Sequence, residues 1–322
     1  MKAPWITYRP ELKVLDCTVR DGGLINNHMF EDGLVKAVYD TCLQAGLDYM
    51  EIGYKASARL FARDKFGDWK YCREDDIRRI VGDNDTPLKL TAMADAEKSD
   101  YHTDILPFED SVLDVIRVAT YVHQIPTAVD MIKDAHDKGY EVTCNLMAVS
   151  TAQEAELEQA LEVIAETPIS TLVVVDSFGS LYAEQIEILV KKYAKAVDGS
   201  GKEIGVHAHN NQQLAFANTI EAIIHGANRV DCTMAGLGRG AGNCPTELLL
   251  GFLRNPKFHL RPVYKLLQDY FVKLREDLEW GPLVPFNITG QLNQHPRAAI
   301  GMRAGKDKNN FVEFYDKCVN ED

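Results

Sequence analysis

The chain has 322 residues, of which 46% are hydrophobic and 26% are charged, the proportions of a globular enzyme with a sizeable core. Its 48 acidic and 35 basic side chains give a net charge of −13, which argues against nucleic acid or an anionic membrane surface as the main partner. The seven cysteines include no CxxC pair and indicate free thiols in a reducing compartment. Because no apolar signal core or run of about 18 apolar residues is present, we expect a cytoplasmic enzyme.

Short β-branched runs alternate with amphipathic stretches along most of the chain. The expected strands are 13–18, 48–54, 88–94, 113–120, 140–149, 170–177, 203–209 and 228–236. The clearest helical patterns between them are 31–46, 150–167, 181–197 and 211–227, and several end in glycine, as helices often do. Eight units in strict alternation predict a (β/α)₈ TIM barrel, with a doubly wound open sheet as the alternative.

The pattern predicts one barrel with an addition at its C-terminal end. Residues 1–255 are expected to form the catalytic TIM barrel, and the polar residues 256–322 a C-terminal helical extension packed on it. The stretch 55–75 is long and charged for a loop after a strand. Loops on that face of a barrel carry function, so we expect this loop to border the site.

The seventh strand ends in two histidines. His207 and His209 are two residues apart and therefore share one face of the strand. The first strand runs into Asp21, and in a closed barrel only the eighth strand separates it from the seventh. A carboxylate and two imidazoles predict a divalent metal site on these three residues, the alternative being polar strand-end histidines without metal.

Arg20, beside Asp21, could neutralise an enolate or alkoxide, or form a salt bridge with Glu51 or Asp176. Ser177 could bind a substrate carboxylate, or cap the next helix.

The run GLGRGAGN follows the last predicted strand. Its position and spacing do not fit a dinucleotide-binding fingerprint, which follows the first strand of a βαβ unit. We expect a mobile loop over the metal site, with Asn243 as a further ligand, as the N-cap of the next helix, or both.

Six motifs in order over residues 12–248 carry a family resemblance: LDCTVRDGG, MEIGY, IRVAT, VVDSFG, VHAHNN and AGLGRGAGNCPTE. Together they resemble the metal-dependent aldolase and acyl-transferase barrels. That family includes 3-hydroxy-3-methylglutaryl-CoA (HMG-CoA) lyase, the isopropylmalate and homocitrate synthases and the 4-hydroxy-2-oxovalerate aldolases, and the chain looks closest to the last. The resemblance places the catalytic arginine on Arg20 and a pyruvate contact on Ser177. It also implies metal ligation, in this chain by Asp21, His207, His209 and Asn243.

The resemblance implies a class II-type aldolase or lyase acting on a C–C bond of a 4-hydroxy-2-oxo acid. Its partners would be a small-molecule 2-oxo acid and an aldehyde, with pyruvate enolate as the intermediate. Mn²⁺ or Mg²⁺ is the expected ion, with Zn²⁺ and Co²⁺ as alternatives, and a homo-oligomer is left open. A Claisen-type acyl transferase using acetyl-CoA and a non-catalytic metabolite-binding barrel are the other hypotheses.

Three departures from the family pattern concern proton handling. Leu24 stands where those aldolases carry a histidine, and Gly-Arg-Gly-Ala replaces the cysteine segment of the lyases. TGQLNQHPRAA replaces the tyrosine-bearing tail segment of the pyruvate aldolases. We expect Arg20, Glu51 and Ser177 to contact the substrate, and His28 or His295 to act as the acid–base group.

Overall fold

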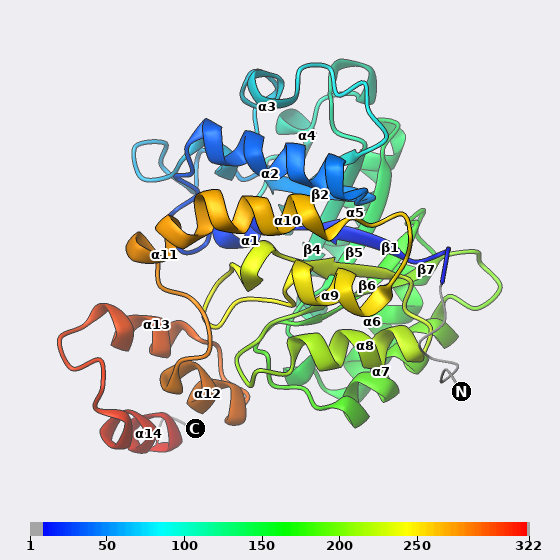
Figure 1. Cartoon of the computed structure of the whole chain (residues 1–322). Helices are drawn as coiled ribbons and strands as arrows, with labels where there is room; N and C mark the ends of the chain where they lie inside the picture. Colours follow the sequence, from blue (N-terminus) through cyan, green and yellow to red (C-terminus); the bar gives the residue numbers. More distant parts are fainter. Residues whose placement is uncertain (1–8, 321–322) are drawn as a thin grey trace, which may run out of the picture.

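The computed structural model describes residues 9–320 and contains a closed barrel of eight parallel strands (Figure 1). Neighbours in sequence are neighbours in the barrel, and β8 pairs with β1, with Asp16 opposite Cys232. This closure confirms the predicted TIM barrel and rules out the open sheet. The strands are β1 (Lys13–Asp16), β2 (Tyr49–Tyr54), β3 (Lys89–Asp95), β4 (Val115–Thr120), β5 (Glu141–Leu146), β6 (Thr171–Asp176), β7 (Glu203–Ala208) and β8 (Arg229–Cys232).

Helices surround the barrel and continue beyond it. Those up to the last strand are α1 (Thr18–Gly22), α2 (Asp32–Ala45), α3 (Glu74–Val81), α4 (Tyr101–Asp104), α5 (Ile125–Asp137), α6 (Glu154–Ala165), α7 (Ala183–Ala196) and α8 (Ala215–Ile224). Those after it are α9 (Thr246–Leu253), α10 (Leu260–Leu266), α11 (Val272–Asp277), α12 (Val284–Gln291), α13 (Arg297–Ala304) and α14 (Phe311–Asn320). The fifth and eighth strands are shorter than predicted, because residues 149–151 and 234–236 turn into short 3₁₀ helices.

The interior of the barrel holds a charged layer in place of the usual aliphatic filling. Arg117 of β4 is 2% exposed and donates from Nη1 to Glu51 Oε2 of β2, at 3.0 Å, and from Nη2 to Asp231 Oδ2 of β8, at 2.5 Å. A small apolar cluster packs beside this layer and consists of Leu15, Cys17, Tyr49 and Val115. The charged layer therefore fixes carboxylates close to the mouth of the barrel.

The second strand is irregular where it meets the mouth. Its register with β3 shifts between Glu51 and Gly53, and Tyr54 then packs with Met93 of β3. A Cβ atom on Gly53 would lie 2.1 Å from the carbonyl oxygen of Trp69. Glycine at this position therefore lets the loop of residues 55–73 fold back over the end of β2.

The C-terminal helices divide between two environments. Helix α10 runs along α2 on the outside of the barrel, whereas α12, α13 and α14 form a separate group (Figure 1), with Asn287 of α12 donating to the carbonyl oxygen of Asn211 in the loop after β7. The second group has its own apolar cluster, formed by Ala241, Phe286, Ile288, Ala299, Phe314 and Cys318. C-terminal helices are thus present as predicted, while the division at residue 255 stays a prediction. Among residues 9–320, no helix has the length and apolar character needed to cross a membrane.

Candidate active site

Asp21, His207 and His209 meet at the C-terminal mouth of the barrel, and each is at most 5% exposed. Asp21 lies on the one-turn helix α1, and His209 follows the last residue of β7. Asp21 Oδ2 is 3.6 Å from Nε2 of His207 and 3.6 Å from Nε2 of His209. These contacts are too long for hydrogen bonds, and one potential ligand atom from each residue lies within 4.8 Å of the other two.

The far nitrogen of each imidazole is held in place. His207 Nδ1 is 3.0 Å from Asp231 Oδ2, and His209 Nδ1 donates to the carbonyl oxygen of Asp176 at 3.0 Å. Both Nε2 atoms are buried and have no hydrogen-bond partner within the described residues. Anchoring one ring nitrogen and leaving the other free is how proteins prepare a histidine to bind a metal.

Burial and nearby charges favour the metal-binding protonation states of Asp21 and His209 but oppose that of His207. Burial favours a protonated Asp21, but Arg20 and the two histidines outweigh it and hold its pKa well below the ordinary value. Burial lowers the pKa of His209 to about 4, so its ring is neutral at pH 7. Burial opposes protonation of His207 too, but the Asp21 and Asp231 carboxylates raise its pKa, and a cation would have to displace that proton.

Asn243 lies beside these three residues. A Cβ atom on Gly238 would be 2.1 Å from Asn243 Nδ2 and 2.6 Å from Asp21 Oδ1, so both side chains approach the same point of the glycine-rich loop. Asn243 Nδ2 donates to the carbonyl oxygen of Leu237, at 3.3 Å, while Oδ1 is buried and free of partners in residues 9–320. The N-cap alternative is wrong, because Pro245 occupies the cap of α9.

The site offers a carboxylate, two imidazoles and an amide oxygen, a set of ligands that fits a divalent cation. In three of these groups, the two imidazoles and the amide, the potential ligand atom is buried without a hydrogen-bond partner in the described residues. Cys17, His207 and Asp231 form another possible ligand set. Burial raises the pKa of the Cys17 thiol well above its ordinary value, and Asp231 Oδ2 already accepts hydrogen bonds from Arg117 and His207. The Asp21 set is therefore the better metal site.

Arg20 is 4% exposed and lies between the metal candidates and the charged layer. Its Nε donates to Glu51 Oε2 at 2.6 Å, and its Nη1 to Asp21 Oδ2 at 2.5 Å. The predicted alternative of a salt bridge is thus correct for Glu51, and no ion pair joins Arg20 to Asp176 in the described part of the chain. Nη2 is buried without a partner, which leaves one donor of the guanidinium group free.

Glu51 is fully buried beneath Arg20. Its Oε2 atom accepts from both Arg20 and Arg117. Its Oε1 atom is buried without a hydrogen-bond partner in residues 9–320. Glu51 thus holds Arg20 in place, and its expected contact with the substrate stays a prediction.

Ser177 and His295 are linked by Arg239, which sequence analysis did not single out. Arg239 donates from its backbone N–H to Asp21 Oδ1, at 3.0 Å, and from Nη2 to the Ser177 carbonyl, at 3.1 Å. Its Nη1 is 3.4 Å from His295 Nε2. Ser177 Oγ accepts from the backbone N–H of Ala148, at 2.8 Å. The cap alternative for Ser177 is wrong, because Tyr182 caps α7.

His295 comes from the tail but reaches the mouth, where its ring meets Phe178 edge-to-face with centroids 5.6 Å apart. Burial and the guanidinium groups of Arg239 and Arg297 lower its pKa to about 4. Its Nδ1 accepts from the backbone N–H of Arg297, at 3.0 Å. A neutral imidazole has one lone pair, and each ring nitrogen of His295 already faces a donor, the Arg297 N–H at Nδ1 and Arg239 Nη1 at Nε2, so no lone pair is free for the substrate.

His28 lies on the opposite side of the mouth and is 1% exposed. Its ring meets that of Tyr54 edge-to-face, with centroids 5.3 Å apart. Burial and the nearby Lys70 and Arg20 cations hold its pKa well below the ordinary value. Neither ring nitrogen has a hydrogen bond to residues 9–320, so the neutral imidazole keeps a free lone pair.

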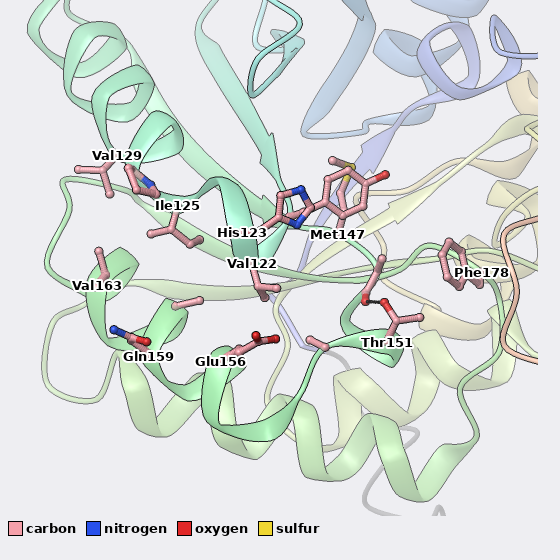
Figure 2. A pocket seen from close by; sticks show the side chains of 15 residues that line it. Val122, His123, Ile125, Val129, Met147, Thr151, Glu156, Gln159, Val163 and Phe178 are labelled. Atoms are coloured by element: carbon pink, nitrogen blue, oxygen red, sulfur yellow. Dashed lines mark hydrogen bonds between the residues drawn. The ribbon is translucent and has the colours of Figure 1, made fainter. Parts of the chain in front are cut away.

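A pocket of about 850 Å³ lies farther out, between α5 and α6. Figure 2 shows Val129 and Val163 at one end and Phe178 near the other. None of the metal candidates lines it. The pocket is therefore separate from the chemical centre, although Phe178 contacts His295 and so borders both.

A parallel barrel with a carboxylate and two imidazoles at its C-terminal mouth defines a barrel enzyme with a centre suited to a divalent cation. Residues 11–263 match the model of the HMGL-like family. The chain belongs to the HMGL-like family and is a carbon–carbon lyase.

Two curated relatives and two solved structures are similar to the chain. An oxaloacetate decarboxylase of Mycobacterium tuberculosis is 31% identical over 255 residues, which are 78% of this chain and 72% of that protein. A 4-hydroxy-2-oxovalerate aldolase of Bacillus cereus is 28% identical over 280 residues, covering 85% and 77%. The N-terminal domain of an aldolase candidate from Bacteroides vulgatus superposes with a TM-score of 0.79 at 26% identity, covering 94% and 99%. The HMG-CoA lyase of Bacillus subtilis shares the fold, with a TM-score of 0.68 at 16% identity, covering 84% and 94%.

Proposed function

We propose that the chain cleaves or forms the C–C bond of a 4-hydroxy-2-oxo acid, releasing or using pyruvate and an aldehyde. The observation that carries this proposal is the free Nη2 of Arg20 next to the two orphaned imidazole nitrogens. It supplies a fixed cation where negative charge develops on a 2-oxo acid. The aldolases among the relatives support the same substrate class.

Asp21, His207, His209 and Asn243 would hold the cation, which supplies Lewis-acid stabilisation of the oxo group when bound. Arg20 then donates from Nη2 to the same developing charge, while Glu51 and Asp21 keep the guanidinium plane fixed. A donor that is already oriented costs no reorganisation during the reaction. We assign Ser177 to the wall of the 2-oxo acid site, because Arg239 joins its carbonyl to Asp21.

His28 is the better acid–base group of the two predicted. Aldol cleavage removes the proton of the 4-hydroxyl group, so the base needs a free lone pair within reach. Neutral His28 has one, whereas the lone pair of His295 accepts the Arg297 N–H. We therefore assign His28 to proton transfer and His295 to packing against Arg239 and Phe178 at the mouth.

Decarboxylation of oxaloacetate is a second candidate, supported by the M. tuberculosis relative. Loss of CO₂ from a 3-carboxy-2-oxo acid gives the same pyruvate enolate, but it requires no removal of a hydroxyl proton. Decarboxylation would therefore need no base such as His28 next to the 4-hydroxyl group. The position of His28 therefore favours the aldolase.

Pyruvate release from a series of 4-hydroxy-2-oxo acids and from oxaloacetate, measured with Mn²⁺, Mg²⁺, Zn²⁺ or Co²⁺, tests this assignment. We expect turnover of at least one hydroxy-oxo acid with Mn²⁺ or Mg²⁺, and none after chelation. Turnover of oxaloacetate alone would favour the decarboxylase, and thiol release from acetyl-CoA would favour an acyl transferase. Cytoplasmic location remains a prediction.

A further inference from the structure

Lys70 is a buried lysine for which the described chain supplies no hydrogen-bond acceptor. Its residue is 7% exposed, and its ammonium group makes no hydrogen bond or ion pair with residues 9–320. Lys55, 2% exposed in the same loop, donates to the Cys72 carbonyl at 2.7 Å and lies 3.4 Å from Glu74 Oε1. Lysines are rarely buried unless they are paired, so Lys70 needs a different explanation.

Aromatic rings surround this ammonium group. Nζ lies 4.3 Å from the ring centroids of both Tyr54 and Phe61, and 5.9 Å from that of Phe66. Cation–π attraction stabilises the charge but does not fill the hydrogen-bonding positions of three N–H donors. Burial lowers the pKa of Lys70 to about 8, so most molecules carry the ammonium form at pH 7.

The nearby carboxylate of Asp95 is within electrostatic range of Lys70. No ion pair joins the two in residues 9–320: Asp95 Oδ2 lies 3.5 Å from Lys98 Nζ, and Oδ1 is buried without a hydrogen-bond partner. The charge of Lys70 is therefore only partly balanced by the protein.

Tyr54 connects this lysine to the reaction centre. The Tyr54 ring contacts His28 on one edge, and the Arg20 guanidinium carbon lies 5.9 Å from its centroid. The ammonium group is thus on the same side of the mouth as the base assigned above. This is where the aldehyde half of the substrate would lie, beyond the 4-hydroxyl group.

We propose that Lys70 binds an anionic group, a carboxylate or a phosphate, on the aldehyde half of the substrate. The inference rests on the proposed aldolase function and narrows its substrates to those whose aldehyde product is negatively charged. The aromatic rings hold the lysine stem, Nζ itself stays accessible to solvent, and the anion completes the hydrogen bonds of the ammonium group. Lys70 is then a specificity-determining residue, and not a group that transfers the aldol proton.

Aldol addition of pyruvate to matched acceptors tests the inference. Butyraldehyde and succinic semialdehyde have the same carbon chain but differ in the terminal carboxylate, and glycolaldehyde phosphate tests a phosphate. We expect kcat/KM for one anionic acceptor to exceed that for butyraldehyde by about 10–100-fold, as for other charge-assisted hydrogen bonds. Lys70→Met should abolish this preference, so that the ratio of kcat/KM for the anionic acceptor to that for butyraldehyde falls to about one. Methionine suits an aromatic environment, and thermal unfolding would verify that this variant folds.

Lys70→Arg should retain most of the preference, because it keeps the cation. Lys65→Met, which removes an exposed lysine from the same loop, should change neither reaction. Equal use of charged and neutral acceptors by the unmodified enzyme would overturn the inference, as would equal losses on both in Lys70→Met.

Exchange of pyruvate methyl protons with solvent needs no aldehyde and so separates the two proposals. Exchange without a preference for charged acceptors rejects only the role of Lys70. An enzyme that neither exchanges these protons nor turns over an acceptor fails the proposed function, and the Lys70 assignment with it.

Discussion

Replacing Arg20 with lysine tests the proposed centre most directly. The guanidinium group has three nitrogens: Nε is 2.6 Å from Glu51 Oε2, Nη1 is 2.5 Å from Asp21 Oδ2, and Nη2 is free. Lysine keeps the positive charge but offers one nitrogen for all three tasks. Because both carboxylates are fully buried, the ammonium group should remain with them and leave the substrate without its donor.

The expected loss is about 10²–10³-fold in kcat, the usual effect of removing one preorganised donor from a developing oxyanion. Losing a buried charge-assisted hydrogen bond should also cost about 1.5–3 kcal/mol of folding stability. Lysine is more informative than alanine here, because alanine would leave Asp21 without its neighbouring cation and disturb the metal site as well. The reaction is followed by coupled pyruvate detection, alongside metal content and thermal unfolding.

Arg79→Lys is a matched control. Arg79 also bridges several carboxylates, those of Asp32, Asp68 and Asp76, but it does so on the surface at α3. Its replacement should leave kcat unchanged. Wild-type turnover in Arg20→Lys would refute the reasoning and leave Arg20 as a structural ion-pair partner. Loss of metal with normal turnover after reconstitution would do the same.

Three further changes probe the groups around Arg20. His207→Ala should lose both the metal and the activity while keeping its fold, and a fully loaded variant in metal analysis would contradict the ligand assignment. Asp231→Asn removes the carboxylate that anchors His207 Nδ1 and should weaken metal affinity about 10–100-fold in a chelator titration; unchanged affinity would show that Arg117 is the only important partner of Asp231. His28→Asn should slow aldol cleavage much more than pyruvate proton exchange, whereas His295→Asn should stay near wild type in both. The opposite ranking would return the acid–base role to His295.

Much of this protein can be read from its sequence. The alternation of β-branched and amphipathic segments predicts the barrel, because a parallel strand must be followed by a crossover helix that returns the chain to the same edge. Period two in a strand places His207 and His209 on one face, and closure of the barrel brings Asp21 near them. These predictions need only local periodicity and one topological rule.

The tertiary structure decided which hydrogen-bonding atoms remain free. Arg20 and Glu51 are each candidate substrate contacts. Glu51 is fully buried with Oε2 bonded to two arginines, and the atoms of the pair without a partner in residues 9–320 are Nη2 of Arg20 and Oε1 of Glu51. The choice between His28 and His295 depends in the same way on the donors that face the His295 ring, the backbone N–H of Arg297 and Nη1 of Arg239. The sequence predicts neither the free atoms of Arg20 and Glu51 nor the partners of His295, because these side chains form hydrogen bonds with residues that are mostly distant along the chain.

The position of Lys70 was also decided by the tertiary structure. Sequence identified its loop as long and charged, but a charged loop ordinarily faces water. A bulge in β2 and the close approach of Trp69 to Gly53 fold the loop back, so that Lys70 becomes buried among aromatic rings. Burial of a charge is a property of the whole packing around it, and for that reason residue order alone could not reveal it.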